Sequence, residues 1–179
     1  MTKKQQPRSG SKTRYTGFVV ASIDGRISFP DKVTADWASR EDQHFFQIAL
    51  ARADAVVVGR NTFEISAVRL RKRNTFVFSS RLKTIRRDGM VTFVNPTNVD
   101  IKELFRGYKN VAVVGGSGVY QTMLDNGFLD EMYVTIEPLI FGRGKEMFVG
   151  GSRMTKLSLV SLRKLNRSGT LLLRYKISQ

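Results

Sequence analysis

The sequence predicts an α/β protein with a mostly parallel central sheet, helices on both faces and an antiparallel C-terminal edge. Strand-like and helix-like segments alternate along most of the chain, which is typical of this class. Two strand-like segments, "AVVV" at 55–58 and "VAVV" at 111–114, are continuously apolar, as strands covered on both faces of a parallel sheet are. The segment 157–178 instead indicates an antiparallel pair that turns at Ser168 and Gly169.

The elements follow from the periodicity of apolar residues. Residues 15–25 indicate a buried first strand that ends in a turn at Asp24 and Gly25. Residues 39–53 predict a helix, because apolar side chains recur there at helical spacing. The first half continues with a strand at 54–59, a helix start at 60–65 and a strand at 75–80. The second half predicts strands at 90–95, 110–116 and 131–142 and helices at 100–107 and 118–127, the last closed by Gly127.

Length and composition fit one folded domain. A chain of 179 residues with 41% hydrophobic content can bury one substantial core, and no feature suggests a second. Residues 1–14 are polar and basic and contain Gly, Ser and Pro, so we expect a disordered leader there. The folded domain is therefore expected over residues 15–179.

Composition also argues against several classes of protein. The chain has no cysteine, which excludes disulfide frameworks and thiolate metal sites, and one histidine leaves little scope for zinc or iron, so we expect no metal. No apolar run reaches the roughly 20 residues that cross a bilayer. The N-terminus lacks the apolar stretch of a secretory signal. We expect a cytoplasmic protein without membrane contact.

The net charge of +15 favours anionic partners. Eight cations and no acid lie between Ile65 and Arg87, namely Arg69, Arg71, Lys72, Arg73, Arg81, Lys83, Arg86 and Arg87. This run is either a solvated basic face or a surface that collects phosphorylated or carboxylated ligands. A nucleic-acid-binding protein is the alternative from another functional class. The chain has no recognised nucleic-acid-binding motif, and a nucleic-acid-binding function would leave its two glycine-rich junctions without a role.

These two junctions, each between a strand and a helix, predict a phosphate site. In "VAVVGGSGVY", at 111–120, the glycines let the backbone turn tightly, and the amides of the next helix start offer donors to a phosphate. In "VVVGRNTFE", at 56–64, Gly59 precedes a helix start that carries Arg60 and Thr62. Each junction alone is also compatible with a tight turn or with an ordinary helix capped by Asn61 or Thr62.

A third strand end adds a group suited to a phosphomonoester. "FVFSSR", at 76–81, ends a strand with two hydroxyls and a guanidinium, although alone it could be a solvated strand end. Together the three strand ends could hold a nucleotide with a diphosphate and an additional 2′-phosphate. That description suits NADPH better than NADH or ATP.

The order and spacing of these motifs resemble the cofactor segments of dihydrofolate reductase. "GRNTFE", then "SSR" twenty residues after Gly59, then "VVGGSGVY" carry a resemblance that runs from about residue 15 to the C-terminus. "VASIDGRIS" and "DEMYVTIEPLIFGRGKEMF" also resemble the reductase domain of riboflavin biosynthesis, which shares the fold. The resemblance implies a dihydrofolate reductase-like fold, NADPH as cofactor, a monomer or homodimer, and cofactor contacts from Ala21, Gly59, Arg60, Thr62, Ser79, Ser80, Arg81, Gly115, Gly116, Ser117, Gly118, Val119 and Tyr120.

The stretch "DWASREDQHFF", at 36–46, favours a folate. In dihydrofolate reductases a Trp is followed five residues later by the acid that hydrogen-bonds the pterin and, four residues after that, by a Phe lining the pocket. Here these positions are Trp37, Asp42 and Phe46. The structural alternative is that Ser39 caps a helix and Asp42 completes a capping box three residues later. The two roles are compatible, because a carboxylate in a first helical turn can face inward.

Other positions match or depart from each reductase. Thr135 falls where the dihydrofolate reductase threonine shares a water with the acid, Arg73 where an arginine binds the glutamate tail, and Val20 where the ring pocket is lined. Thr135 could instead be an ordinary strand residue, and Arg73 one more surface cation. Riboflavin reductases typically carry Asp-Asp-Pro where this chain has "EISAVRLRKR", and an acid where it has Val114. Departures from dihydrofolate reductase are Asp36 for Pro, Gln43 for an apolar residue and Gly118 for Arg.

The resemblance therefore implies NADPH-dependent reduction of dihydrofolate to tetrahydrofolate. Hydride would pass to C6 of the pterin and a proton to N5, with Asp42 and Thr135 as catalytic residues. The alternative is a riboflavin-pathway reductase that acts on a diaminopyrimidinone ribosylamino phosphate. In both cases the partner is a small pterin or pyrimidine.

Overall fold

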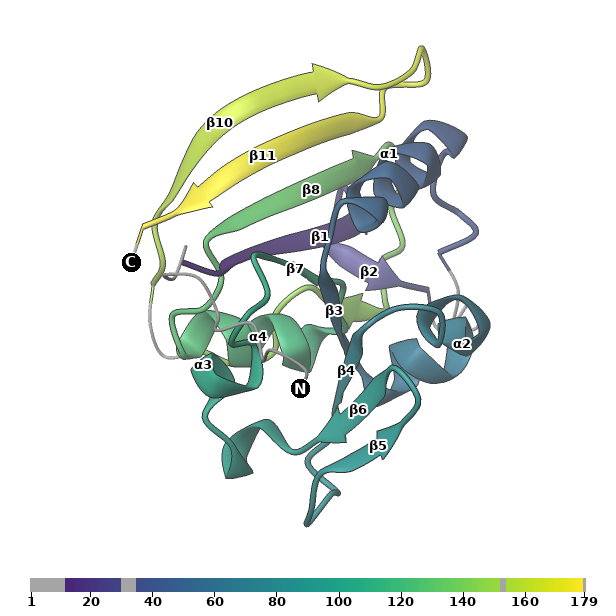
Figure 1. Cartoon of the computed structure of the whole chain (residues 1–179). Helices are drawn as coiled ribbons and strands as arrows, with labels where there is room; N and C mark the ends of the chain where they lie inside the picture. Colours follow the sequence, from purple (N-terminus) through teal and green to yellow (C-terminus); the bar gives the residue numbers. More distant parts are fainter. Residues whose placement is uncertain (1–11, 30–34, 152–153, 179) are drawn as a thin grey trace.

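The fold is built on a nine-stranded sheet in the order β10-β11-β8-β1-β7-β3-β4-β6-β5 (Figure 1). The computed structural model describes residues 12–29, 35–151 and 154–178. From β8 to β6 the neighbouring strands are parallel, whereas β10, β11 and β5 pair antiparallel. The predicted parallel sheet with an antiparallel C-terminal edge is therefore confirmed. Within these residues no helix is long and apolar enough to span a membrane.

The parallel strands fall within the predicted segments, except that β1 begins one residue earlier, at Arg14. They are β1 (Arg14–Ser22), β3 (Ala55–Gly59), β4 (Thr75–Phe78), β6 (Val91–Val94), β7 (Asn110–Val113) and β8 (Glu131–Glu137). The antiparallel edge consists of β10 (Leu157–Lys164) and β11 (Leu171–Ile177). Strand β8 ends earlier than its apolar pattern suggests, because Pro138 has no backbone N–H to continue a ladder.

Three short strands were not predicted from the sequence. They are β5 (Arg86–Asp88), which pairs with β6, and β2 (Arg26–Ser28) and β9 (Lys145–Glu146), which form a separate pair. Each has only two or three residues, and none is fully buried. Such strands exist only because a partner lies alongside, so they leave no apolar alternation in the sequence.

Helices cover both faces of the sheet. They are α1 (Arg40–Ala51), α2 (Arg60–Leu70), α3 (Ile101–Leu104) and α4 (Ser117–Asp125), with a short 3₁₀ helix η1 (Pro96–Asn98) before α3. Helices α1 and α2 pack on one face, and α3 and α4 on the other. The predicted helix start at 60–65 extends to Leu70, across a kink at Ser66.

Two cores form because successive strand residues point to opposite faces of the sheet. In β3, Ala55 and Val57 pack toward α3 and α4, whereas Val56 and Val58 pack toward α1 and α2. This explains why "AVVV" has no polar alternation: both of its faces are buried.

The expected disordered leader, residues 1–14, lies largely outside the described residues. Within them, Arg14 already belongs to β1, and its backbone N–H donates to the Lys109 carbonyl at 2.8 Å. The Thr13 hydroxyl donates to the Tyr108 carbonyl at 2.9 Å. Thr13 and Arg14 therefore already contact the folded domain, slightly before its expected boundary at residue 15.

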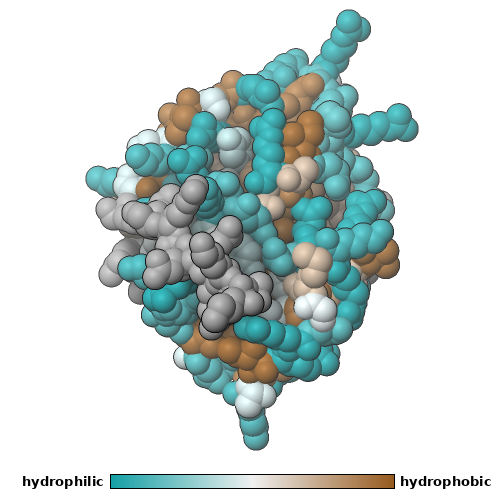
Figure 2. Space-filling model, viewed as in Figure 1, coloured by the Kyte–Doolittle hydropathy of each residue, from teal (hydrophilic) through white to brown (hydrophobic). Residues whose placement is uncertain are grey.

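Figure 2 shows that the face drawn in Figure 1 is mostly hydrophilic, as the excess of Lys and Arg leads one to expect. Apolar residues also reach the surface, above all along the edge strand β10. There Leu157, Leu159, Val160 and Leu162 are each about half exposed. This strand has a sheet neighbour on one side only.

Candidate active site

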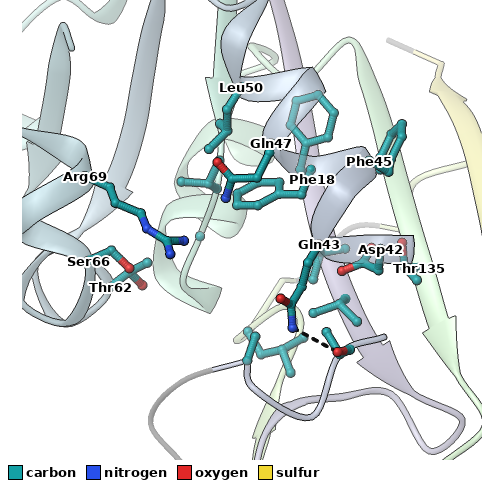
Figure 3. A pocket seen from close by; sticks show the side chains of 18 of the residues that line it. Phe18, Asp42, Gln43, Phe45, Gln47, Leu50, Thr62, Ser66, Arg69 and Thr135 are labelled. Carbon is teal, nitrogen blue, oxygen red and sulfur yellow. Dashed lines mark hydrogen bonds between the residues drawn. The ribbon is translucent and has the colours of Figure 1, made fainter. Parts of the chain in front are cut away.

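A cleft of about 1140 Å³ opens at the carboxyl ends of the central strands. Parallel strands end at one edge of a sheet, so the loops that follow them meet there. Residues of β1, α1, α2, β8 and the junction between β7 and α4 line the cleft (Figure 3). Nine of the candidate site residues predicted from the sequence line it: Val20, Asp42, Phe46, Thr62, Arg73, Gly115, Gly116, Tyr120 and Thr135.

Asp42 occupies the enclosed end of the cleft, in the first turn of α1. Its side chain is only 7% exposed and lies beside Thr135 of β8 (Figure 3). Burial raises the pKa of Asp42 to about 6, because a desolvated carboxylate loses the hydration that favours its charge. A hydrogen bond with the Thr135 side chain acts in the opposite direction, and the charge of Glu137 raises the pKa further. Asp42 can therefore gain and lose a proton near neutral pH.

The capping of α1 shows whether the Asp42 carboxylate closes the capping box that was its structural alternative. Ser39 is the N-cap, and its side chain accepts a hydrogen bond from the Asp42 backbone N–H at 3.3 Å. In a closed capping box the Asp42 carboxylate would in turn accept from the Ser39 N–H. That N–H instead donates to Oε1 of Glu137 at 2.7 Å. The Asp42 carboxylate is thus not committed to the cap.

Aromatic side chains form an apolar wall next to Asp42. Phe18 stacks on Tyr133 with ring centroids 5.4 Å apart and an interplanar angle of 2°. Phe45 and Phe46 lie against Phe18 at centroid distances of 6.2 and 6.3 Å, and all four residues line the cleft. Such a wall can hold a planar heterocycle.

Trp37, by contrast, is not among the residues that line the cleft. Its ring packs edge to face on Phe141, with centroids 4.9 Å apart. Its indole N–H is buried and has no hydrogen-bond partner within the described part of the chain. The expected contact between Trp37 and substrate stays a prediction, and the side chain here has a packing role.

The opposite wall of the cleft is basic and polar. Thr62, Ser66 and Arg69 of α2 lie together there, with the Arg69 guanidinium directed into the cleft (Figure 3). Arg73 also lines the cleft, but its Nη1 donates to the Leu50 carbonyl at 2.8 Å and so links the ends of α1 and α2. Within the described residues Arg69 forms no ion pair or side-chain hydrogen bond. Of the two arginines, Arg69 has the side chain that is free for a ligand.

The two glycine junctions predicted from the sequence lie against each other. The Gly59 N–H donates to the Gly115 carbonyl at 2.7 Å. A Cβ on Gly59 would stand 3.3 Å from Val119 and 3.5 Å from the Gly116 nitrogen. Gly115 has a φ of +91°, which residues with a side chain rarely adopt, and a Cβ there would stand 3.0 Å from Tyr120. Glycine is therefore required at Gly115, whereas a side chain at Gly59 would need Val119 to give way slightly.

The helices that follow these junctions begin without a side-chain cap. Gly59 is the N-cap of α2 and Gly116 that of α4, and neither can supply an oxygen to the first amides. The alternative in which Asn61 or Thr62 caps α2 is wrong, because the helix already starts at Arg60. Thr62 instead lines the cleft.

The remaining expected cofactor residues do not line the cleft itself. Ala21 and Val119 are buried in the fold, and the Ser117 side chain donates to the Glu146 carbonyl. Gly118 is exposed in the first turn of α4, and Arg60 forms an exposed ion pair with Glu64 at 2.8 Å. Ser79, Ser80 and Arg81 follow β4 at the same edge of the sheet. Their cofactor contacts stay predictions.

Sequence reasoning missed three residues of this region. Glu137 and Arg69 look like an ordinary strand end and one cation in a basic run. Ser66 is marked only by its non-helical backbone, with φ −113° and ψ 15°. The one available signal was spacing, since Thr62, Ser66 and Arg69 recur at helical intervals. Among the described residues no three His, Cys, Asp or Glu side chains gather as metal ligands would.

Comparison with known proteins identifies related chains. Residues 16–171 match the protein family described as RibD C-terminal domain. The uncharacterized protein YyaP of Bacillus subtilis is 23% identical over 163 residues, which cover 81% of this chain and 85% of YyaP.

Solved structures share the fold at low sequence identity. A pyrimidine reductase-like protein from Corynebacterium diphtheriae superposes with a TM-score of 0.74 at 17% identity, over 93% of this chain and 92% of its own. RibD of Acinetobacter baumannii gives 0.74 at 17% identity, over 93% of this chain and 58% of RibD. Dihydrofolate reductase of Enterococcus faecalis, complexed with NADP(H) and RAB-propyl, gives 0.65 at 22% identity, over 93% and 97%. The dihydrofolate reductase-like fold is therefore confirmed.

Proposed function

Because the chain belongs to the RibD C-terminal domain family, we propose that it is an NADPH-dependent reductase of a small pyrimidine of the diaminopyrimidinone ribosylamino phosphate type. The observation that carries the proposal is a single cleft with a buried, protonatable Asp42 at one end and a glycine-walled junction beside it. The pattern around Asp42 led us to expect dihydrofolate as the main substrate. The family match supports the pyrimidine alternative better.

The residues at the glycine junctions fit NADPH. The uncapped starts of α2 and α4 offer N–H donors to phosphates, and Gly116, where a Cβ would meet only the Thr62 hydroxyl at 3.8 Å, allows a ligand to approach its backbone. Thr62 adds a hydroxyl on the same wall. Ser79, Ser80 and Arg81 would hold a 2′-phosphate at the end of β4. When bound, NADPH supplies the hydride from C4 of its nicotinamide.

The Asp42 carboxyl group holds the proton that the reduction requires. Both candidate substrates can present a carbon–nitrogen double bond: the carbon accepts the hydride, and the nitrogen accepts a proton. With a pKa of about 6, Asp42 is protonated in an appreciable fraction of molecules at neutral pH. Thr135 orients the carboxyl group through its hydroxyl. The buried position of Asp42 limits loss of this proton to bulk water.

The rest of the cleft orients the substrate. The aromatic wall of Phe18, Phe46 and Tyr133 provides a flat apolar surface for a heterocycle next to Asp42. The opposite wall presents Arg69, whose charge suits an anionic tail. The two walls together favour a substrate with a planar ring at one end and a phosphate or carboxylate at the other.

Dihydrofolate is the second candidate substrate. It is favoured by the pairing of Asp42 with Thr135 and by Phe46 in the cleft wall, all at the positions that the dihydrofolate reductase resemblance gave. Val114 also lines the cleft, where the riboflavin reductases typically carry an acid. The two candidates share the reduction chemistry and differ in the ring that must fit.

Turnover decides between them. Purified full-length protein is incubated with NADPH and either the diaminopyrimidinone ribosylamino phosphate or dihydrofolate, and NADPH oxidation is followed by absorbance. Faster turnover of the pyrimidine supports the proposal, and faster turnover of dihydrofolate supports the second candidate. No NADPH oxidation with either compound, in protein that is folded by circular dichroism, would refute both.

A further inference from the structure

We propose that Glu137 is a positioning residue that holds the first turn of α1, and with it the carboxylate of Asp42, from the end of strand β8. The inference rests on the proposed role of Asp42. Glu137 does not line the cleft, and nothing in its sequence context marks it. Its contacts join three separate segments of the chain.

Both carboxylate oxygens of Glu137 are engaged although the residue is only 3% exposed. Oε1 accepts the Ser39 backbone N–H at 2.7 Å, and Oε2 accepts the Thr170 hydroxyl at 2.6 Å. A buried carboxylate is costly unless its oxygens are hydrogen-bonded, so these two contacts hold the side chain in one orientation. Glu137 therefore links β8 to the start of α1 and to the β10–β11 hairpin.

This arrangement divides the capping of α1 between the Ser39 hydroxyl and the Glu137 carboxylate. The Ser39 side chain caps the Asp42 N–H, and the acid at the third helical position would normally return to the Ser39 N–H. Glu137 fills that acceptor role from another strand. Because the cap is complete without Asp42, its carboxylate can turn toward Thr135 and the cleft. Without Glu137, the carboxylate of Asp42, at the third helical position, could accept the Ser39 N–H instead.

The hairpin turn supports Glu137 from its other side. Oδ1 of Asn166 accepts the backbone N–H groups of Gly169 and Thr170, both at 3.1 Å. Nδ2 of Asn166 donates to the Thr170 hydroxyl at 2.9 Å and to Oε2 of Glu41 at 3.2 Å. Glu41 is the residue before Asp42 in α1. The hairpin turn, Glu137 and the first turn of α1 thus form one connected unit.

The charge of Glu137 gives this role a specific signature. Among the titratable groups of this region, Asp36 in the loop before α1 and His44 in α1 also line the cleft. Arg40 and Glu41 are exposed on α1. Of all these groups, Glu137 is the one whose charge perturbs the Asp42 pKa, and it raises it. Neutralising Glu137 should therefore move the titration of Asp42 to lower pH, which a purely structural side chain would not do.

The test uses two variants of Glu137 and a matched control in the full chain. Glu137→Gln keeps an acceptor for the Ser39 N–H but removes the charge, so the Asp42 carboxyl, followed by ¹³C NMR, should titrate at lower pH than in the wild type. Glu137→Ala removes the acceptor as well and should lower kcat roughly tenfold to a hundredfold, because small displacements of a catalytic group cost that much. Glu131→Gln, on the same strand and paired with Arg174 at 2.9 Å, should change neither quantity.

Two results would overturn the inference. One is an unchanged Asp42 titration in Glu137→Gln, which needs no substrate and so is independent of the proposed function. The other is a Glu137→Ala protein with wild-type kcat per folded molecule and only a lowered melting temperature. A downward titration shift in Glu137→Gln together with absent turnover in the wild-type protein would support the positioning role and refute the proposed reaction instead.

Discussion

The two ends of the cleft are built from opposite kinds of polar group. At the Asp42 end, a carboxyl group is 7% exposed, hydrogen-bonded with Thr135, and has its pKa raised to about 6 by burial. At the Arg69 end, a cation is exposed on α2 and has no partner among the described residues. Desolvation shifts the protonation equilibrium of the buried carboxyl group, whereas an exposed cation can attract an anionic ligand. The first end is thus suited to chemistry and the second to binding.

Asp42→Asn is the variant with the largest expected effect on the chemistry at the buried end of the cleft. The amide has the same shape but can neither hold nor release the proton, so kcat at neutral pH should fall on the order of a hundredfold or more. Activity should recover partly as the pH is lowered, because solvent can then protonate the substrate nitrogen directly. Steady-state rates between acid and neutral pH measure both effects. A kcat like that of the wild type at neutral pH would show that the buried end of the cleft does not provide the proton.

The cofactor region offers a second set of polar groups whose proposed role is to bind a ligand. Ser79, Ser80 and Arg81 would add charge-assisted contacts to a 2′-phosphate, each worth roughly 1.5 to 3 kcal/mol. One such contact corresponds to about ten- to a hundredfold, so we expect kcat/KM to be higher with NADPH than with NADH by at least that factor, and Arg81→Ala to reduce the preference. Parallel steady-state assays with the two cofactors test this. Equal efficiency with both would remove the assignment of these residues to the phosphate.

Variants of Arg69 and Arg73 test ligand binding and structural support by the basic wall separately. Arg69→Ala should raise the KM for an anionic substrate about tenfold without a change in kcat or melting temperature, because its side chain lines the cleft and forms no ion pair or hydrogen bond with another described residue. Arg73→Ala should also lower stability by about 1 kcal/mol, since it loses the hydrogen bond to the Leu50 carbonyl.

Arg71→Ala is the matched control for these two variants. Arg71 is exposed, does not line the cleft, and pairs with Asp88 at 2.7 Å. Its loss should leave KM unchanged. An equal rise in KM in all three variants would point to a general effect of positive charge rather than to a ligand contact by Arg69.

The smallest expected effect is a pH-dependent change in the free energy of unfolding of Asp42→Asn. The native pKa of Asp42, about 6, lies above its ordinary value of 3.8, so the native state binds the proton more tightly than the unfolded chain. Ionised Asp42 therefore destabilises the fold above pH 6, and this penalty disappears as the pH falls toward 4. Asp42→Asn should be more stable than wild type by about 1 to 2 kcal/mol at pH 7, with the difference shrinking at lower pH.

Urea unfolding of both proteins across this pH range measures the difference. A mutant less stable than wild type at pH 7 would indicate that Asp42 serves the helix cap after all. That result would also weaken the division of roles between Asp42 and Glu137.

The sequence by itself determined the elements whose signals are local. The buried strands "AVVV" and "VAVV" identify themselves because both faces of a parallel strand must be apolar. Ser39 predicts the start of α1, because an N-cap and the helix that it caps are neighbours in the chain. The glycine junction at Gly115 is visible for the same reason, since its positive φ restricts the residue type at that position.

Only the tertiary structure decided which partner each polar group takes. Ser39 and Asp42 form a capping-box pattern in sequence, yet Glu137, 98 residues away from Ser39, accepts the Ser39 N–H. Arg69 and Arg73 look alike in a basic run, yet one faces the cleft and the other holds the end of α1. Trp37 matches a pocket position, yet packs on Phe141. Hydrogen bonds and packing act over a few ångströms in space whatever the separation in the chain, so local patterns cannot choose among such partners.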